Sequence, residues 1–244
     1  MLFAGGAAGA INVAVGSGTL ITFPALLAVG YSPLAANVSN TVGLVPGSVA
    51  GAFGYRRELR PVGRRLFAYG AASASGGLLG GVLLLTLPAG AFEVIVPVLV
   101  GLAVLLVAFQ PLLSSRLGSD RRGREAKRHA GPALLGAIFA TGVYGGYFGA
   151  AQGVILLGVM GVLLSDDMQE INAIKNVLAG LVNAVAAVLF IAVADVAWEP
   201  AGLIAVGSTI GGTLGAKVAR RLAPATLRAV VVVVGLTALV LLLR

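Results

Sequence analysis

The chain has 244 residues, of which 58% are hydrophobic and only 11% are charged, with a mean hydropathy of +1.00. A soluble domain of this size is about one-quarter charged, so the composition argues against a soluble globular fold. Apolar runs of roughly 18 or more residues recur from end to end, and each is long enough to cross a bilayer. The composition predicts an all-α integral membrane protein.

The net charge of +8 does not indicate a nucleic-acid partner, because the basic residues lie in short loops between apolar runs. That placement is typical of the cytoplasmic loops of membrane proteins. The chain has no cysteine and its one histidine, His129, lies in the most basic loop, so no disulfide, metal site or cofactor is expected. Without paired carboxylates or a histidine inside an apolar run, we expect no catalytic residues and no enzymatic activity.

Eight hydrophobic elements follow one another along the chain, and we place them at residues 2–30, 33–55, 66–88, 92–113, 132–164, 169–193, 198–219 and 225–243. The long hydrophilic connector 114–131 contains SSRLGSDRRGREAKRH and separates four elements from four. We therefore predict one membrane domain built from a first repeat, 1–113, a basic cytoplasmic loop, 114–131, and a second repeat, 132–244.

A shift of 135 residues brings similar residues of the two halves into register. It aligns Asn37 with Asn172, Ser73 with Ser208, Gly18 with Gly153, the pair 76–77 with 211–212, and Gly80 with Gly215. Sequence rich in Ala, Gly, Leu and Val gives chance matches, so coincidence is the alternative. A constant register across three elements favours an internal duplication.

The first element of each half is interrupted by glycines, at VGSG (15–18) and at YGGYFGAAQG (144–153). Glycine weakens a helix, and a broken helix is tolerated at membrane depth only where it lines a cavity or is covered by protein. Interrupted segments at matching positions of two halves indicate the binding site of a transporter. We expect both segments to be broken or re-entrant.

Loop charge distinguishes two topologies. If all eight elements cross the membrane, the basic residues other than Lys175 divide 12 to 4 between the two sides. If the first and fifth elements dip in and return, each half crosses three times, the halves are inverted, and the division becomes 15 to 1. Because cytoplasmic loops carry an excess of Lys and Arg, the inverted arrangement is favoured, although the first element is long enough to span.

The second element of each half carries a polar stripe. With about 100° per residue, Asn176 and Asn183 lie within about 40° of Asn172, and Lys175 lies about 60° the other way. In the first half the same four positions hold Asn37, Asn40, Thr41 and Ser48, with Asn40 in the place of Lys175. Hydrogen bonding between helices is one explanation of such polar residues.

Lys175 is harder to explain by packing, because a lysine at the centre of a membrane helix costs about 2.5–3.5 kcal/mol on insertion scales. The lysine could extend to the membrane surface, or pair with Asp166, Asp167 or Glu170 nearby. The alternative is that its ammonium contacts an anionic substrate. Helix N-termini after the glycine runs would add N–H donors, and Ser17, Thr19 and Gln152 lie at those breaks.

Small residues recur at four-residue spacing in SASGGLLGG (73–81) and STIGGTLGA (208–216). Such spacing lets two helix backbones approach closely. We therefore expect these two segments to pack directly against other helices.

The segment GAINVAVGSGTLITFPALLAVGYSPLAANVSNTVGLVPGSVAGAFGYRREL (9–59) resembles the first-half signature of the TauE/SafE sulfite exporter family. GVYGGYFGAAQGVILLGVMGVL, followed by INAIKNVLAGLVNAVAAVLF, resembles its second-half signature. The usual pattern has three glycines where this chain has Ser17 in VGSG and Gln152 in AAQG.

The resemblance implies a multi-pass permease of a bacterial-type plasma membrane that moves a small sulfur-containing anion such as sulfite, thiosulfate or an organosulfonate. The alternatives are a permease for a different small organic anion and a membrane scaffold that transports nothing. The oligomeric state stays open, with a homodimer as one option, and the lipid bilayer is the other expected partner. The predicted substrate-binding residues are Lys175, Asn172, Asn176, Asn183, Asn37, Asn40, Thr41, Ser48, Ser17, Thr19 and Gln152.

Overall fold

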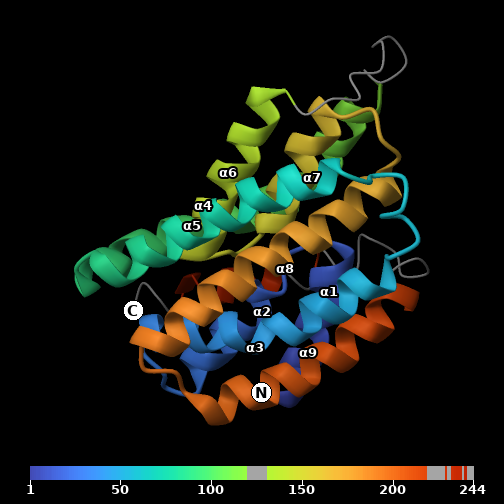
Figure 1. Ribbon diagram of the computed structural model, residues 1–244. Helices are drawn as coiled ribbons and strands as arrows, with labels where there is room; N and C mark the ends of the chain where they lie inside the picture. The colour runs from blue at the N-terminus through green and yellow to red at the C-terminus, as the bar shows by residue number, and fades with distance from the viewer. Residues whose placement is uncertain (120–130, 219–228, 230–231, 238, 241–244) are drawn as a thin grey trace.

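The computed structural model describes residues 1–119, 131–218, 229, 232–237 and 239–240 (Figure 1). Its elements in this part of the chain are α1 (Leu2–Ala14), α2 (Thr19–Ala28), α3 (Pro33–Gly54), α4 (Arg65–Thr86), α5 (Ala89–Ser119), α6 (Pro132–Tyr147), α7 (Gln152–Leu163), α8 (Met168–Val193) and α9 (Trp198–Val218). The prediction of an all-α protein is confirmed. Of the last predicted element, 225–243, residues 232–237 are helical and most others lie outside the described residues.

The two glycine-interrupted elements are each divided into two helices, as expected. The predicted element 2–30 forms α1 and α2, and 132–164 forms α6 and α7, with the breaks at 15–18 and 148–151. The predicted elements between these breaks each form one helix. The division matters for function because each break exposes the polar ends of two helices inside the protein.

Helices α3 and α8 begin at positions that are 135 residues apart, Pro33 and Met168. Before α3, the Ser32 side chain accepts a hydrogen bond from Ala35 N, and proline fixes the first helical turn. Before α8, Asp167 and Glu170 form a capping box. The two halves therefore start equivalent helices in the same register, with different capping residues.

Helix α1 packs on α9, which belongs to the other half of the chain (Figure 1). Gly5 of α1 faces Ile204, and one turn later Gly9 faces Ser208, so closely that an added Cβ would overlap the α9 backbone. The order shows that α1 and α9 run parallel. Helix α3 also follows this direction, since Gly43 faces Ile204 and, one turn later, Gly47 faces Ser208.

The second half repeats this exchange, because α6 packs on α4 of the first half. Gly76 faces Phe139 and Gly80 faces Val143, again backbone to backbone and in parallel order. The predicted close packing of the two small-residue segments is thereby confirmed. The first half-helix of each repeat packs on a helix of the other repeat, so neither repeat is packed by itself.

Helix α8 runs parallel to α4, because Ser73 Oγ donates to Leu178 O and, one turn later, Gly77 faces Val182. Helices α3 and α8 run antiparallel to each other. Near the end of α3, Tyr55 packs with Ala173 near the start of α8. Farther along, Asn183 Nδ2 donates to Ser48 Oγ at 3.5 Å. Equivalent helices of the two halves thus point in opposite directions, as the prediction of inverted repeats requires.

Helices α1 and α2 form one hairpin, and α6 and α7 form another. The connections α2–α3 and α7–α8 lie on the faces of the protein at which these hairpins begin. Since α1 and α3 run parallel, α2 must lead the chain back, and the same holds for α6, α7 and α8. Arg65 at the start of α4 forms an ion pair with Asp166 before α8, which places these two loops on one face. The topology with eight crossings would put them on opposite faces, so the re-entrant arrangement is the one that the fold adopts.

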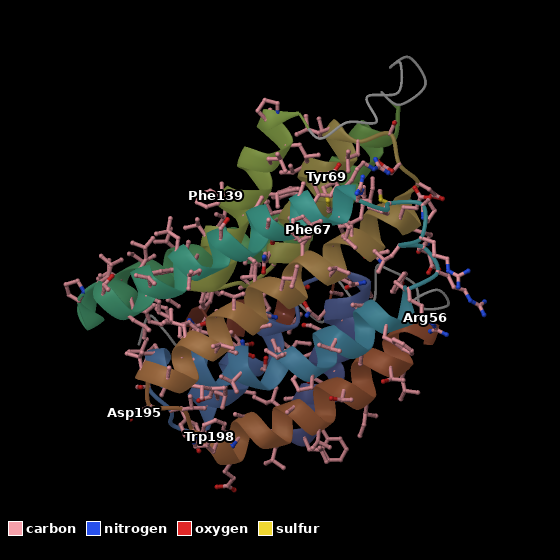
Figure 2. The ribbon with its side chains drawn as sticks, in the orientation of Figure 1. Arg56, Phe67, Tyr69, Phe139, Asp195 and Trp198 are labelled. Atoms are coloured by element: carbon pink, nitrogen blue, oxygen red, sulfur yellow. The ribbon has the colours of Figure 1, made fainter. Side chains whose placement is uncertain are left out.

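Three helices in the described part of the chain are long and apolar enough to cross a membrane: Arg65–Thr86, Gly90–Phe109 within α5, and Met168–Val193. Helices α1, α2 and α7 are apolar but shorter. Figure 2 shows Asp195 and Trp198 together at the α8–α9 connection, at the end of the bundle away from Arg56. Trp198 is 60% exposed there.

Candidate functional site

The two breaks meet in the interior of the protein. Gly153 N donates to Gly16 O at 3.1 Å, and a Cβ on either glycine would overlap the backbone of the other. Gly16 has a φ of +84°, and Ala151, which is 135 residues farther on, has a φ of +59°. Because a left-handed alanine is strained, its presence in one break matches the use of such conformations at functional sites.

Lys175 lies beside this crossing and is fully buried. Its Nζ donates to Asn12 O and to Val13 O, each at 3.0 Å, and Asn176 Nδ2 donates to Val13 O at 3.4 Å. These carbonyls belong to the last turn of α1, which has no continuing helix to pair them and carries partial negative charge. A side chain from α8 therefore caps the half-helix α1 and holds its end in place.

The three acidic residues near the start of α8 are engaged elsewhere. Asp166 accepts two hydrogen bonds from the guanidinium of Arg65, at 2.7 and 3.2 Å, and Asp167 with Glu170 forms the cap of α8. The alternative in which Lys175 pairs with one of these carboxylates is therefore not what the structure adopts. Among the described residues no carboxylate neutralises its charge.

The other half-helix, α6, is capped in the mirrored way by α3. Asn37 Nδ2 donates to Tyr147 O at 3.0 Å, at the last residue of α6. Tyr147 is the counterpart of Asn12 under the 135-residue shift, so equivalent carbonyls are held in both halves. Each polar stripe thus reaches across to the broken helix of the opposite repeat.

Asn40, the counterpart of Lys175, contacts its own repeat instead. Its Nδ2 donates to Thr19 Oγ1 at 3.3 Å, and its Oδ1 accepts a short hydrogen bond from Thr22 Oγ1. Both threonines lie in the first turn of α2. Asn40 therefore holds α2, the second half-helix of its own repeat, whereas its counterpart Lys175 holds the end of α1 in the opposite repeat.

The remaining stripe residues are engaged in helix packing. Thr41 Oγ1 donates to Asn37 O at 2.9 Å, and Ser48 Oγ donates to Leu44 O at 3.0 Å. Asn183 joins Ser48 between α3 and α8, as the scaffold alternative would predict for that pair. The hydrogen bonds of these three side chains lie within α3 or between α3 and α8, and in the described part of the chain none of them reaches the two breaks.

Four of the predicted residues each contain a buried polar atom with no hydrogen-bond partner in the described part of the chain. The atoms are Ser17 Oγ, Gln152 Nε2, Asn37 Oδ1 and Asn172 Oδ1. They form two pairs related by the 135-residue shift, Ser17 with Gln152 and Asn37 with Asn172. Since buried polar groups are nearly always paired, two related pairs of exceptions call for a ligand or ordered water.

Sequence reasoning missed the groups that close this site from α1 and α6. The carbonyls of Asn12 and Val13 hold Lys175, and Tyr147 supplies both a carbonyl and a buried hydroxyl without a partner among the described residues. Tyr144 in the same helix donates to Ala150 O within the break. Their position in the last turn before each glycine break was the available signal.

Similarity to known proteins identifies the family to which this chain belongs. Residues 1–242 match the sulfite exporter TauE/SafE family. Two similar relatives are the probable membrane transporter protein YfcA of Escherichia coli K12, 27% identical over 93% of this chain and 82% of its own, and a probable membrane transporter protein of Haemophilus influenzae, 25% identical over 91% and 85%. No solved structure matches the chain significantly. The chain belongs to the sulfite exporter TauE/SafE family.

Proposed function

We propose that the chain moves a small sulfur-containing anion, such as sulfite, thiosulfate or an organosulfonate, across a bacterial-type plasma membrane. Membership of the family makes the chain a membrane transporter, and its relatives carry names of that kind. The substrate is suggested by the family's description as sulfite exporters. The proposed site is the crossing of the two breaks, bounded by Lys175, Ser17, Gln152, Asn37 and Asn172.

The observation that carries this proposal is the surroundings of Lys175. A fully buried ammonium has two neutral carbonyls as its partners, and two of its three N–H donors are used. A buried charge without a counter-charge is costly, so an anion that binds beside it is strongly favoured. Ser17 and Gln152 add unpaired donors nearby, which suit the oxygens of a small oxyanion.

The arrangement of the two repeats suits transport by alternating access around the same site. The inverted repeats supply two related halves, and broken helices at their interface are where transporters of this kind bind substrate. Because α1 and α6 are each held by the opposite repeat, movement of one repeat against the other would change the crossing directly. The substrate would then be exposed first to one face and then to the other.

The test is flux through the purified protein in liposomes. Labelled sulfite, thiosulfate and ethanesulfonate are offered to the wild type, to Lys175→Ala and to Lys127→Ala, which removes a lysine of the basic loop. We expect saturable flux of at least one anion, lost in Lys175→Ala and kept in Lys127→Ala. Equal flux in wild type and Lys175→Ala would refute the site, and the absence of flux of all three sulfur anions would refute the substrate class.

A further inference from the structure

The unpaired atoms of the predicted site residues differ in hydrogen-bonding character. Ser17 Oγ and Gln152 Nε2 can donate, as can the third N–H of Lys175. Asn37 Oδ1 and Asn172 Oδ1 can only accept. An anion without hydrogens on its oxygens can satisfy the donors but cannot itself pair with the acceptors.

The acceptor at Asn37 is fixed by its neighbour. The two ends of an asparagine amide are usually assigned from the hydrogen bonds they make. At Asn37 the assignment has one solution, because Tyr147 O accepts only and lies 3.0 Å from the amide nitrogen. Turning the amide over would place two oxygens against each other, so Oδ1 remains the free atom. No such contact fixes Asn172, and the argument rests on Asn37.

Asn37 and Gln152 lie at the same end of α6. Asn37 bonds to Tyr147 O, the last residue of the helix. The side-chain amide of Gln152 lies directly on Gly145, where an added Cβ would overlap it. The fixed acceptor of Asn37 and the unpaired amide of Gln152 are thus held by one helical turn, and both side chains are at least nine-tenths buried.

We infer that the transported anion carries a hydrogen-bond donor of its own. Hydrogen sulfite and alkanesulfonates bearing a hydroxyl or ammonium group meet this requirement, whereas unsubstituted alkanesulfonates do not. This inference rests on the proposed function, because it concerns the substrate of the same site. A site built to accept a hydrogen bond discriminates strongly against an analogue that lacks the donor, since its own acceptor is then left buried and unpaired.

The experiment uses 2-hydroxyethanesulfonate and ethanesulfonate, which share the sulfonate and the carbon chain and differ in one hydroxyl. Binding of each to the purified wild-type protein is measured by calorimetry, in sodium and in choline buffers. We expect 2-hydroxyethanesulfonate to bind at least ~10-fold more tightly in both buffers. Equal affinities would overturn the inference. A preference that disappears in choline would also overturn it, because the acceptor would then be occupied by a sodium ion and not by the hydroxyl of the anion.

Sulfite itself provides a second arm. Across the pH range in which sulfite takes up a proton, its binding should follow the fraction of hydrogen sulfite. Thiosulfate stays deprotonated in this range and serves as the control, because any change of its binding with pH must come from groups of the protein such as Lys175 or Tyr147. Tighter binding of the fully deprotonated ion overturns the inference while the proposed function stands. Failure of all four anions to bind overturns the proposed function.

Variants locate the effect. In Asn37→Leu the preference for the hydroxylated sulfonate should fall to about twofold or less, whereas Thr86→Val, an exposed polar-to-apolar change on α4, should keep it. A folded Asn37→Leu protein with unchanged preference overturns the inference. If that variant does not fold, the comparison of the two sulfonates on the wild type decides alone.

Discussion

The ends of the two half-helices α1 and α6 occupy equivalent places in the fold but are held by different chemistry. The last turn of α1 receives a lysine and an asparagine from α8, while that of α6 receives the amide of Asn37 from α3. The repeat therefore determines where a side chain reaches, and the individual residue determines the charge it brings. The site is symmetric in its backbone and one-sided in its electrostatics.

The largest effect should come from removing the charged cap. Lys175→Ala is expected to lower transport at least ~100-fold, since both the cation and the hold on α1 are lost. Moving the charge with Lys175→Asn and Asn40→Lys should not restore transport, because Asn40 contacts the first turn of α2, where the helix end carries partial positive charge, and not the free carbonyls at the end of a helix. Lys175→Arg should retain part of the binding, since the charge survives with altered geometry.

Flux in liposomes measures these variants, with size-exclusion profiles to show that each is folded. Recovery of wild-type flux in the variant that combines Lys175→Asn with Asn40→Lys would show that the two positions are equivalent. The proposed electrostatic difference between the two halves would then be wrong.

The next effect concerns the crossing itself. Gly153→Ala should destabilise the protein by about 1–3 kcal/mol, because a Cβ would overlap the Gly16 backbone and press on Lys175. Gly136→Ala is the matched control, since it lies in α6 with open space around it, and it should be neutral or stabilise by up to ~1 kcal/mol. Thermal unfolding in detergent compares them. Equal melting temperatures would show that the breaks can separate without cost.

A smaller difference should separate the two amide caps. Asn37 is the side chain that holds the α6 end, so Asn37→Ala should cost about 1 kcal/mol. Asn176 shares Val13 O with Lys175, at the longer distance of 3.4 Å, so Asn176→Ala should cost less than half as much. The melting temperatures of the two variants order them, and the reverse order would mean that the lysine contributes little to the α1 cap.

The last effect, which should be small and dependent on salt, is expected at the Arg65–Asp166 ion pair. The counterparts of these residues are Pro200 and Tyr31, so the opposite face has no equivalent pair at those positions. Arg65 is 25% exposed, and Arg65→Gln should therefore cost about 1 kcal/mol or less, an amount that shrinks as salt is added. Unfolding at low and high ionic strength measures it, and a loss independent of salt would assign Arg65 a packing role instead.

Much of this arrangement was readable from the sequence because it depends on local signals. Glycine clusters located both breaks, and the constant register at Asn37 and Asn172 revealed the repeat. The partner of Lys175 was not predictable, because the carbonyls of α1 lie more than 160 positions away and lack a side-chain signature. The acids beside it in sequence suggested a local ion pair, yet Asp166 is held by Arg65.

The exchange of half-helices between repeats escaped prediction for the same reason. Small residues on α4 and α9 predicted close packing but did not identify the helix that packs there. Ser48 and Asn183 were placed in the site by helical periodicity, which gives the direction of a side chain around its axis. It does not give the depth at which that side chain meets a neighbour.

The contact between Asn183 and Ser48 joins a residue to its own counterpart, 135 positions apart. A contact of this kind lies on the rotation axis that relates the two repeats. If transport proceeds by exchanging the conformations of the repeats, the exchange maps this pair onto itself and leaves its separation unchanged. Labels at positions 48 and 183 would then serve as a stationary reference, against which distances such as that from 65 to 166 report which way the transporter is open.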